Sequence, residues 1–111
     1  MLFLIELDTD SGALAQTPAA DIKALVQKEW DWGLNAYRAG KMLRIWFKAS
    51  GSGAVGIFDF ASHDELHQAM RALPFFRYFS DIRVTPLVGH PLYPHFDRPD
   101  ADVAFYSPPA K

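Results

Sequence analysis

The chain has 111 residues, a formal net charge of −2 at pH 7 and no cysteine, and 50% of its residues are hydrophobic. This length allows one domain with a substantial core, and the composition excludes a disordered protein. Lys and Arg are scattered and form no basic stripe of the kind that binds a phosphate backbone, so we expect no nucleic acid partner.

The lack of cysteine excludes a disulfide framework, a thiolate nucleophile and a Cys-based zinc site. The first apolar run is too short for a signal peptide, and no apolar stretch approaches the ~20 residues that span a bilayer. We therefore expect a cytoplasmic protein without a membrane segment.

The first half of the chain predicts a strand followed by a long helix. Residues 2–8 are apolar on both faces, which is typical of a central strand. Residues 17–40 have helical periodicity, and we expect Thr17 to cap this helix, Pro18 to occupy its first position and Gly40 to end it.

Residues 41–48 alternate with a period of two and predict a second strand. The alternation assigns Leu43, Ile45 and Phe47 to one face and Met42, Arg44, Trp46 and Lys48 to the other. Residues 49–53 form a Gly- and Ser-rich loop, and residues 54–60 are predicted to be the hairpin partner of the second strand.

A second helix of about ten residues is predicted after Ser62, because Ser62 and Glu65 have the spacing of a capping box. Pro74 ends this helix, and residues 81–88 predict a fourth strand in which Pro86 indicates a sheet edge or a bulge. The order predicts an α+β, ferredoxin-like βαββαβ fold, with two helices on one face of a four-stranded antiparallel sheet.

We expect residues 1–90 to form this domain and residues 91–111 to form a Pro-rich tail. The tail contains too many apolar residues to be fully solvated, so we expect it to dock on a neighbouring subunit or on a pocket mouth. The sheet face opposite the helices also carries large apolar groups such as Trp46. A face of this kind predicts a homo-oligomer.

Glu29 is the main candidate for a functional residue. It follows Ile22 by seven residues and lies on the predicted apolar face of the long helix, which comprises Ile22, Leu25, Val26, Gly33, Ala36 and Tyr37. An ionised carboxylate is costly to bury, so Glu29 must be paired, neutral or directed into a ligand cavity. One interpretation is a structural acid that pairs with a nearby cation such as Arg44 or Lys48 or that extends to the solvent at the helix edge, and the other is a general base.

A block of residues around the second predicted helix carries a family resemblance. It comprises Ile57-Phe58-Asp59, Ser62, Leu66-His67, Leu73-Pro74, Phe76, Tyr78, Asp81-Ile82 and His90-Pro91, and it extends back to Trp46, Gly40 and Glu29. These residues resemble the muconolactone Δ-isomerase family over most of residues 1–91. The resemblance implies a subunit that associates through its sheet into a dimeric α+β barrel, and that moves a double bond in an unsaturated lactone without a cofactor.

In that family a glutamate on the first helix is a candidate base, and Glu29 is the matching position. An enolate intermediate requires a group that stabilises negative charge on oxygen. The candidates are Arg44, Lys48, Tyr37 and His67, of which His67 also matches the family. The predicted catalytic residues are therefore Glu29, Arg44 and His67.

The predicted substrate-binding residues are Trp30, Trp32, Tyr37, Trp46, Lys48 and His90. Trp30 and Trp32 flank Glu29 and form either an aromatic wall or core and interface packing. His90 either shapes the turn after the last strand or directs an imidazole toward the pocket. His63 and His67 have a chelating spacing, but the capped start of the helix explains them more simply, and we predict no metal.

Two departures from the family pattern change the expected substrate. Phe47 follows Trp46 where the family tends to have arginine, and residues 52–54 replace a Tyr-Ala-Asn segment. Both changes remove polar groups, so we expect a substrate more apolar than muconolactone. The leading hypothesis is a cofactor-independent isomerase of an unsaturated lactone or enone. The alternatives are a barrel monooxygenase or lyase acting on an aromatic or polyketide-like substrate, and a non-catalytic ligand-binding or assembly subunit.

Overall fold

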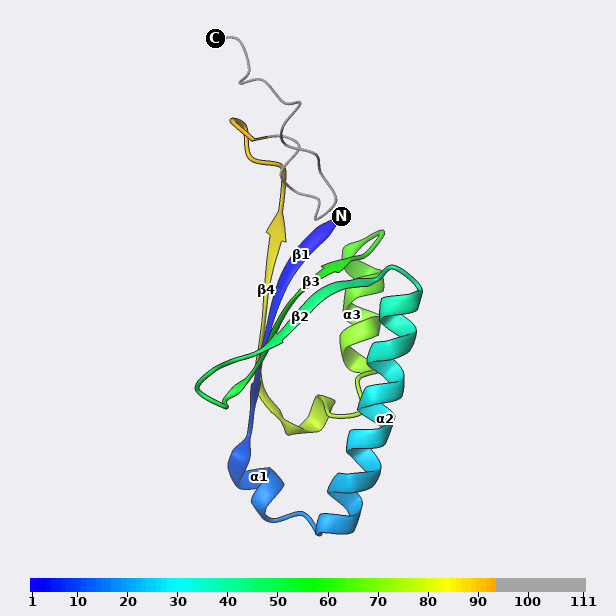
Figure 1. The fold of residues 1–111 in the computed structure, drawn as a ribbon, viewed down its shortest axis with the longest axis vertical. Helices are drawn as coiled ribbons and strands as arrows, with labels where there is room; N and C mark the ends of the chain where they lie inside the picture. Colours follow the sequence, from blue (N-terminus) through cyan, green and yellow to red (C-terminus); the bar gives the residue numbers. More distant parts are fainter. Residues whose placement is uncertain (94–111) are drawn as a thin grey trace.

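A computed structural model describes residues 1–93, which form a four-stranded antiparallel sheet with helices on one face (Figure 1). The elements are β1 (Leu2–Thr9), α1 (Ser11–Ala15), α2 (Ala19–Arg38), β2 (Met42–Phe47), β3 (Gly53–Asp59), α3 (His63–Arg71), a 3₁₀ turn η1 (Phe76–Tyr78) and β4 (Phe79–Leu87). The strand order is β2-β3-β1-β4. This confirms the predicted α+β, ferredoxin-like arrangement.

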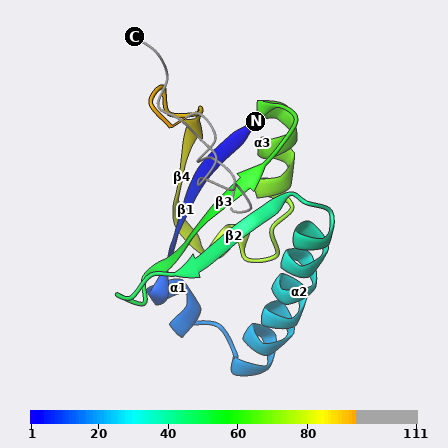
Figure 2. The same cartoon turned by 45° about the horizontal axis from the view of Figure 1, so that its top comes forward.

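β1 is a central strand, as predicted, because it pairs with β3 on one side and β4 on the other. Its residues Phe3, Ile5 and Leu7 are buried on the face toward the helices, here called the inner face. The rest of the core comes from β3, α3 and the segments that flank them, through Phe58, Phe60, Leu66, Met70 and Leu73. Figure 2 shows α2 and α3 on the same side of the sheet.

The predicted alternation of β2 is wrong at its first residues. The pairing of β2 with β3 shifts between Met42 and Arg44, so that Met42 lies opposite Phe58 and Arg44 lies opposite Ile57. A β-bulge of this kind adds one residue to one strand and changes the face of every residue before it. Met42 therefore lies on the inner face with Ile45 and Phe47. The alternation assigns Leu43 to that face instead.

The start of the long helix also differs from the prediction. A short helix, α1, precedes α2, and the Asp10 side chain caps α1 by accepting a hydrogen bond of 3.0 Å from the Ala13 backbone N–H. The Thr17 hydroxyl donates to the Ala13 carbonyl oxygen of α1 at 2.9 Å instead of capping the start of α2. Pro18 is the N-cap residue of α2. Gly40 follows the end of α2 with a φ of 73°, as expected of a helix-terminating glycine.

The predicted apolar face of α2 does not pack into the core. Against the rest of residues 1–93, no residue of α2 is fully buried, and Val26 and Tyr37 are 52% and 61% exposed. The core lies beneath α3 instead, where Leu66 and Met70 are buried. α2 therefore leaves a space between its apolar face and the inner face of the sheet.

The second helix and the last strand agree with the sequence. The Ser62 hydroxyl accepts a hydrogen bond of 3.0 Å from the Glu65 N–H, and a Glu65 carboxylate oxygen accepts one of 3.0 Å from the Ala61 N–H. β4 is an edge strand, which explains how it tolerates Pro86. No helix within residues 1–93 has both the length and the apolar character needed to cross a membrane. The predicted docking of the tail concerns residues that mostly lie outside the described ones.

Candidate active site

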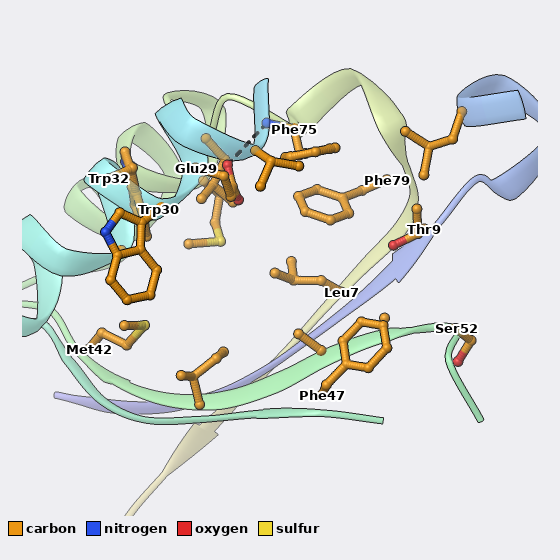
Figure 3. Close-up of a pocket in the computed structure, with 18 of the residues that line it drawn as sticks. Leu7, Thr9, Glu29, Trp30, Trp32, Met42, Phe47, Ser52, Phe75 and Phe79 are labelled. Atoms are coloured by element: carbon orange, nitrogen blue, oxygen red, sulfur yellow. Dashed lines mark hydrogen bonds between the residues drawn. The ribbon is translucent and has the colours of Figure 1, made fainter. Parts of the chain in front are cut away.

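A cavity of about 1000 Å³ lies between α2, the inner face of the sheet and the segment that follows α3 (Figure 3). Leu7, Met42 and Phe47 line it from the strands, and Phe75 and Phe79 line it from the segment after α3. The cavity exists because α2 contributes no fully buried residue among residues 1–93 and leaves this part of the inner face uncovered.

Glu29 extends from α2 into this cavity (Figure 3). One of its carboxylate oxygens accepts a hydrogen bond of 3.2 Å from the backbone N–H of Phe75. Its side chain is half-buried, and it forms no ion pair with any residue among residues 1–93. Of the three situations expected for a carboxylate on this face, the structure thus shows the one directed into a cavity.

The surroundings of Glu29 make its carboxylate a better proton acceptor. Burial raises the pKa of Glu29 above the ordinary value of 4.5, and the hydrogen bond from Phe75 opposes this effect only in part. A carboxyl with a raised pKa is a stronger base than an ordinary carboxylate, which suits the abstraction of a proton from carbon.

We expect Glu29→Gln to make the protein more stable at neutral pH. A pKa that is higher in the folded chain means that the folded state binds the extra proton, so stability falls as pH rises above the ordinary carboxyl pKa. Gln keeps an oxygen for the Phe75 N–H but carries no charge. Thermal unfolding should give a higher Tm for the variant at about pH 8 and nearly equal values at about pH 4. A variant that is less stable than wild type at about pH 8 would contradict a destabilising charge at this position.

Three other predicted residues also line the cavity: Trp30, Trp32 and Tyr37. Trp30 lies beside Glu29 in the cavity view and is 65% exposed, so it borders the opening (Figure 3). Trp32 is partly buried and packs against the core. Tyr37 lies two helical turns after Glu29, and Gly33 lies between them on the same face of α2.

Arg44, Trp46 and Lys48 lie on the opposite side of the sheet, here called the outer face. Arg44 pairs in register with Ile57 and donates a hydrogen bond of 2.7 Å to the Leu43 carbonyl oxygen, and Trp46 is 53% exposed. Lys48 forms ion pairs with Asp8 at 2.7 Å and with Glu6 at 3.2 Å. The interpretation of Glu29 as a structural acid paired with Arg44 or Lys48 is therefore wrong for the described chain.

The two predicted histidines lie away from the cavity in a single subunit. His67 is exposed on α3. His90 follows β4, where its Nδ1 accepts a hydrogen bond of 3.1 Å from the Leu92 N–H and its ring lies 5.1 Å from that of Tyr93. Among residues 1–93, no group of three or more His, Asp or Glu side chains is arranged to hold a metal ion.

The structure adds site groups that the sequence analysis does not include. The Phe75 N–H has no sequence signature, because every residue except proline carries such a donor. Four hydroxyl-bearing residues also line the cavity, Thr9, Ser11, Ser50 and Ser52, and two of them, Thr9 and Ser52, lie far from Trp30 in the view of Figure 3. The Ser50 and Ser52 hydroxyls are hydrogen-bonded to each other at 2.9 Å.

Comparison with known proteins relates nearly the whole of residues 1–93 to one family. A family model described as muconolactone delta-isomerase matches residues 1–92. The muconolactone Δ-isomerase of Cupriavidus pinatubonensis is 33% identical over 91 residues, which are 82% of this chain and 96% of that protein. The muconolactone Δ-isomerase of Acinetobacter baylyi is 32% identical over 91 residues, which are 82% of this chain and 92% of that protein.

Solved structures share the fold. A crystal structure of muconolactone isomerase superposes with a TM-score of 0.73 at 28% identity and covers 87% of this chain and 98% of its own. A 5-chloro-2-hydroxyhydroquinone dehydrochlorinase from Burkholderia phenoliruptrix superposes with a TM-score of 0.63 at 21% identity, covering 81% and 96%, which supports the fold alone. Because the family model spans residues 1–92 and the curated relatives are matched along nearly their whole length, the chain belongs to the muconolactone Δ-isomerase family of isomerases.

Proposed function

We propose that this protein is a cofactor-independent isomerase that moves a carbon–carbon double bond in an unsaturated lactone or enone, with Glu29 as the base that carries the proton. The observation that supports this most strongly is the position of Glu29. Its carboxylate is half-buried in a cavity, is oriented by the Phe75 N–H and forms no ion pair within residues 1–93.

The proposed reaction has two proton transfers through one carboxyl group. Glu29 removes a proton from the γ carbon of the conjugated carbonyl compound, and the electrons of that C–H bond shift to form a dienolate. The protonated Glu29 then returns the proton to the α carbon, and the double bond moves from the α,β to the β,γ position. The reverse direction uses the same groups, so the carboxylate is regenerated in either case.

Tyr37 is the group that we assign to the dienolate oxygen. Of the four candidates from the sequence, it is the one that lines the cavity formed by residues 1–93, whereas Arg44 and Lys48 lie on the outer face and His67 is exposed on α3. A phenol can donate a hydrogen bond to an oxyanion, and such donors stabilise the charge that develops during enolisation.

The identity of the product tests this function. The full chain is incubated with α-angelica lactone, a neutral β,γ-unsaturated lactone, and the mixture is followed by NMR and with an oxygen electrode. We expect the conjugated isomer to accumulate without oxygen uptake. Oxygen uptake coupled to product formation would instead identify a monooxygenase. If neither this lactone nor a panel of related enones is isomerised, the isomerase function is wrong.

The proposal includes self-association through the outer face. This face carries Leu4, Trp46, Val55 and Ile57, beside an ion-pair network that joins Glu6, Asp8, Lys48, Asp81 and Arg83. Sheets with an uncovered apolar face commonly meet a second subunit. Sedimentation velocity of the full chain should give a dimer or a larger ring, and a monomer at micromolar concentration would contradict this part of the proposal.

A further inference from the structure

The cavity beside Glu29 has an unusual balance of charge. In the described part of the chain, its lining includes Glu29 but no Lys, Arg or His. The two cations closest to Ile45 and Phe47 in sequence lie on the outer face, where Lys48 pairs with Glu6 and Asp8 and Arg44 donates a hydrogen bond to the Leu43 carbonyl oxygen. Among residues 1–93, a ligand in this cavity therefore meets the Glu29 carboxylate and no counter-charge.

We propose that the substrate is a neutral, largely apolar unsaturated carbonyl compound with more than one ring, and that the cavity discriminates against carboxylated lactones. This inference rests on the proposed function of Glu29 and adds to it the chemical class of the substrate. Muconolactone carries a free carboxylate beside its single lactone ring, so it belongs to the class that this cavity disfavours.

The charge of Glu29 disfavours a carboxylated ligand in this cavity. A substrate carboxylate would lie in the same partly desolvated space as the Glu29 carboxylate, with no cation from residues 1–93 to compensate either group. Two like charges about 10 Å apart at an effective dielectric constant of about 20 repel strongly enough to weaken binding by about tenfold. Desolvation of the second carboxylate weakens binding further.

The size of the cavity favours a ligand with more than one ring. The cavity volume of about 1000 Å³ is at the upper end of the range of ~300–1,000 Å³ that accommodates drug-sized ligands. A single-ring lactone would leave most of this space and most of its apolar lining without contacts. Gly33 and Gly51 enlarge the space, because these lining residues lack side chains for which there would be room on α2 and on the β2–β3 loop.

The distribution of polar groups in the cavity favours a ligand with one oxygen-bearing end. The hydroxyl-bearing residues Thr9 and Ser52 lie at one end of the cavity, while Trp30 and Met42 lie toward the other (Figure 3). Neutral hydroxyls recognise a carbonyl, ether or hydroxyl oxygen, and aromatic and thioether groups pack on an apolar ring. A substrate with an oxygen-bearing end and an apolar ring system matches this polarity.

Two matched probes test the inference: coumarin, a neutral bicyclic unsaturated lactone, and coumarin-3-carboxylate. Their affinities for the full chain are measured by isothermal titration at about pH 8. We expect coumarin to bind at least about tenfold more tightly than its carboxylate. The difference should become smaller in Glu29→Gln, because that variant lacks the repelling charge. Tighter or equal binding of the carboxylate, or no binding of coumarin, overturns the inference.

A pair of arginine variants locates the effect. Phe47→Arg places a cation on the inner face at the cavity, and we expect it to improve binding of the carboxylate by about tenfold or more. Ala24→Arg adds the same charge at an exposed position of α2 away from the cavity, so the preference for coumarin should remain. Equal effects of the two variants would show that selectivity arises outside the cavity and would overturn the inference.

These outcomes are separate from those that test the proposed function. If neutral lactones are isomerised but the carboxylated probe is preferred, the substrate class is wrong and the isomerase function stands. If coumarin is preferred but no lactone or enone is isomerised, the function is wrong and the ligand class stands.

Discussion

Glu29→Gln is expected to lower isomerase turnover by about 10²–10⁴-fold, the range that a positioned general base contributes. Gln has nearly the same shape as Glu, and its amide oxygen can still accept the hydrogen bond that Phe75 donates at 3.2 Å. It cannot accept a proton from carbon at neutral pH. The loss should therefore be found in kcat, measured from formation of the conjugated lactone, and not in the Kd of a neutral probe.

Asp31→Asn is the matched control for this variant. Asp31 is an exposed acid on the same helix, two residues after Glu29, and it accepts a hydrogen bond of 3.2 Å from the Gln27 amide. Its removal changes the net charge of the chain by the same amount but leaves the cavity unchanged. Turnover by Asp31→Asn should remain close to that of wild type, and a comparable loss in both variants would indicate a general charge effect.

Gly33→Leu is expected to lower kcat/KM by at least about tenfold, because a leucine side chain would occupy the space in which a substrate must lie. Gly33 lines the cavity one helical turn after Glu29 and lies on the same face. A Cβ atom added at Gly33 would meet only the Met42 methyl carbon, at an ordinary contact distance of 3.7 Å. The backbone therefore accommodates a side chain here, and any kinetic loss comes from the filled cavity.

Two further variants separate occlusion from helix stabilisation. Gly33→Ala should raise the free energy of unfolding by about 0.5–1 kcal/mol, because alanine is the better helix former, and should affect kinetics much less than Gly33→Leu. Ala24→Leu adds the same side chain at an exposed position of α2 away from the cavity and should leave kcat/KM unchanged. Normal kinetics of Gly33→Leu would show that substrate does not use this part of the cavity.

Helical periodicity is sufficient to direct Glu29 and Asp31 to different sides of α2, because successive side chains of an α-helix are rotated by about 100°. It did not predict how far α2 stands from the sheet, since that depends on the packing of α3 and the strands. The face that contains Val26 and Tyr37 was therefore expected to be buried, whereas the structure places both at the cavity and leaves them largely exposed.

The errors in the sequence interpretation come from features that local patterns do not encode. Simple alternation puts Leu43 on the same face of β2 as Ile45 and Phe47. The bulge after Met42 puts Met42 there instead, and this bulge depends on the pairing with β3. Thr17 is a residue type that often caps helices. Here α1 lies so close that the Thr17 hydroxyl donates a hydrogen bond to the Ala13 carbonyl oxygen instead.

The departures noted at Phe47 and residues 52–54 are the most informative part of the sequence. Phe47, Ser52, Gly53 and Ala54 all line the cavity, although they lie on β2, β3 and the loop between them. Loss of polar groups at these positions could thus be read from the sequence, and the structure places the changed residues on the same cavity as Glu29. Arg44 and Lys48 were correctly placed on the face opposite Phe47, yet they were also predicted as site residues, and a single subunit does not bring them to Glu29.

The most direct measurement of the role of Glu29 is the rate at which deuterium enters α-angelica lactone in D₂O, compared by NMR for wild type and Glu29→Gln at equal concentration. A base that removes and returns substrate protons exchanges them with solvent, so wild type and Asp31→Asn should incorporate deuterium at carbons of the allylic system. Glu29→Gln should incorporate it no faster than the reaction without protein. Incorporation by Glu29→Gln at the wild-type rate would contradict the assignment of Glu29 as the base.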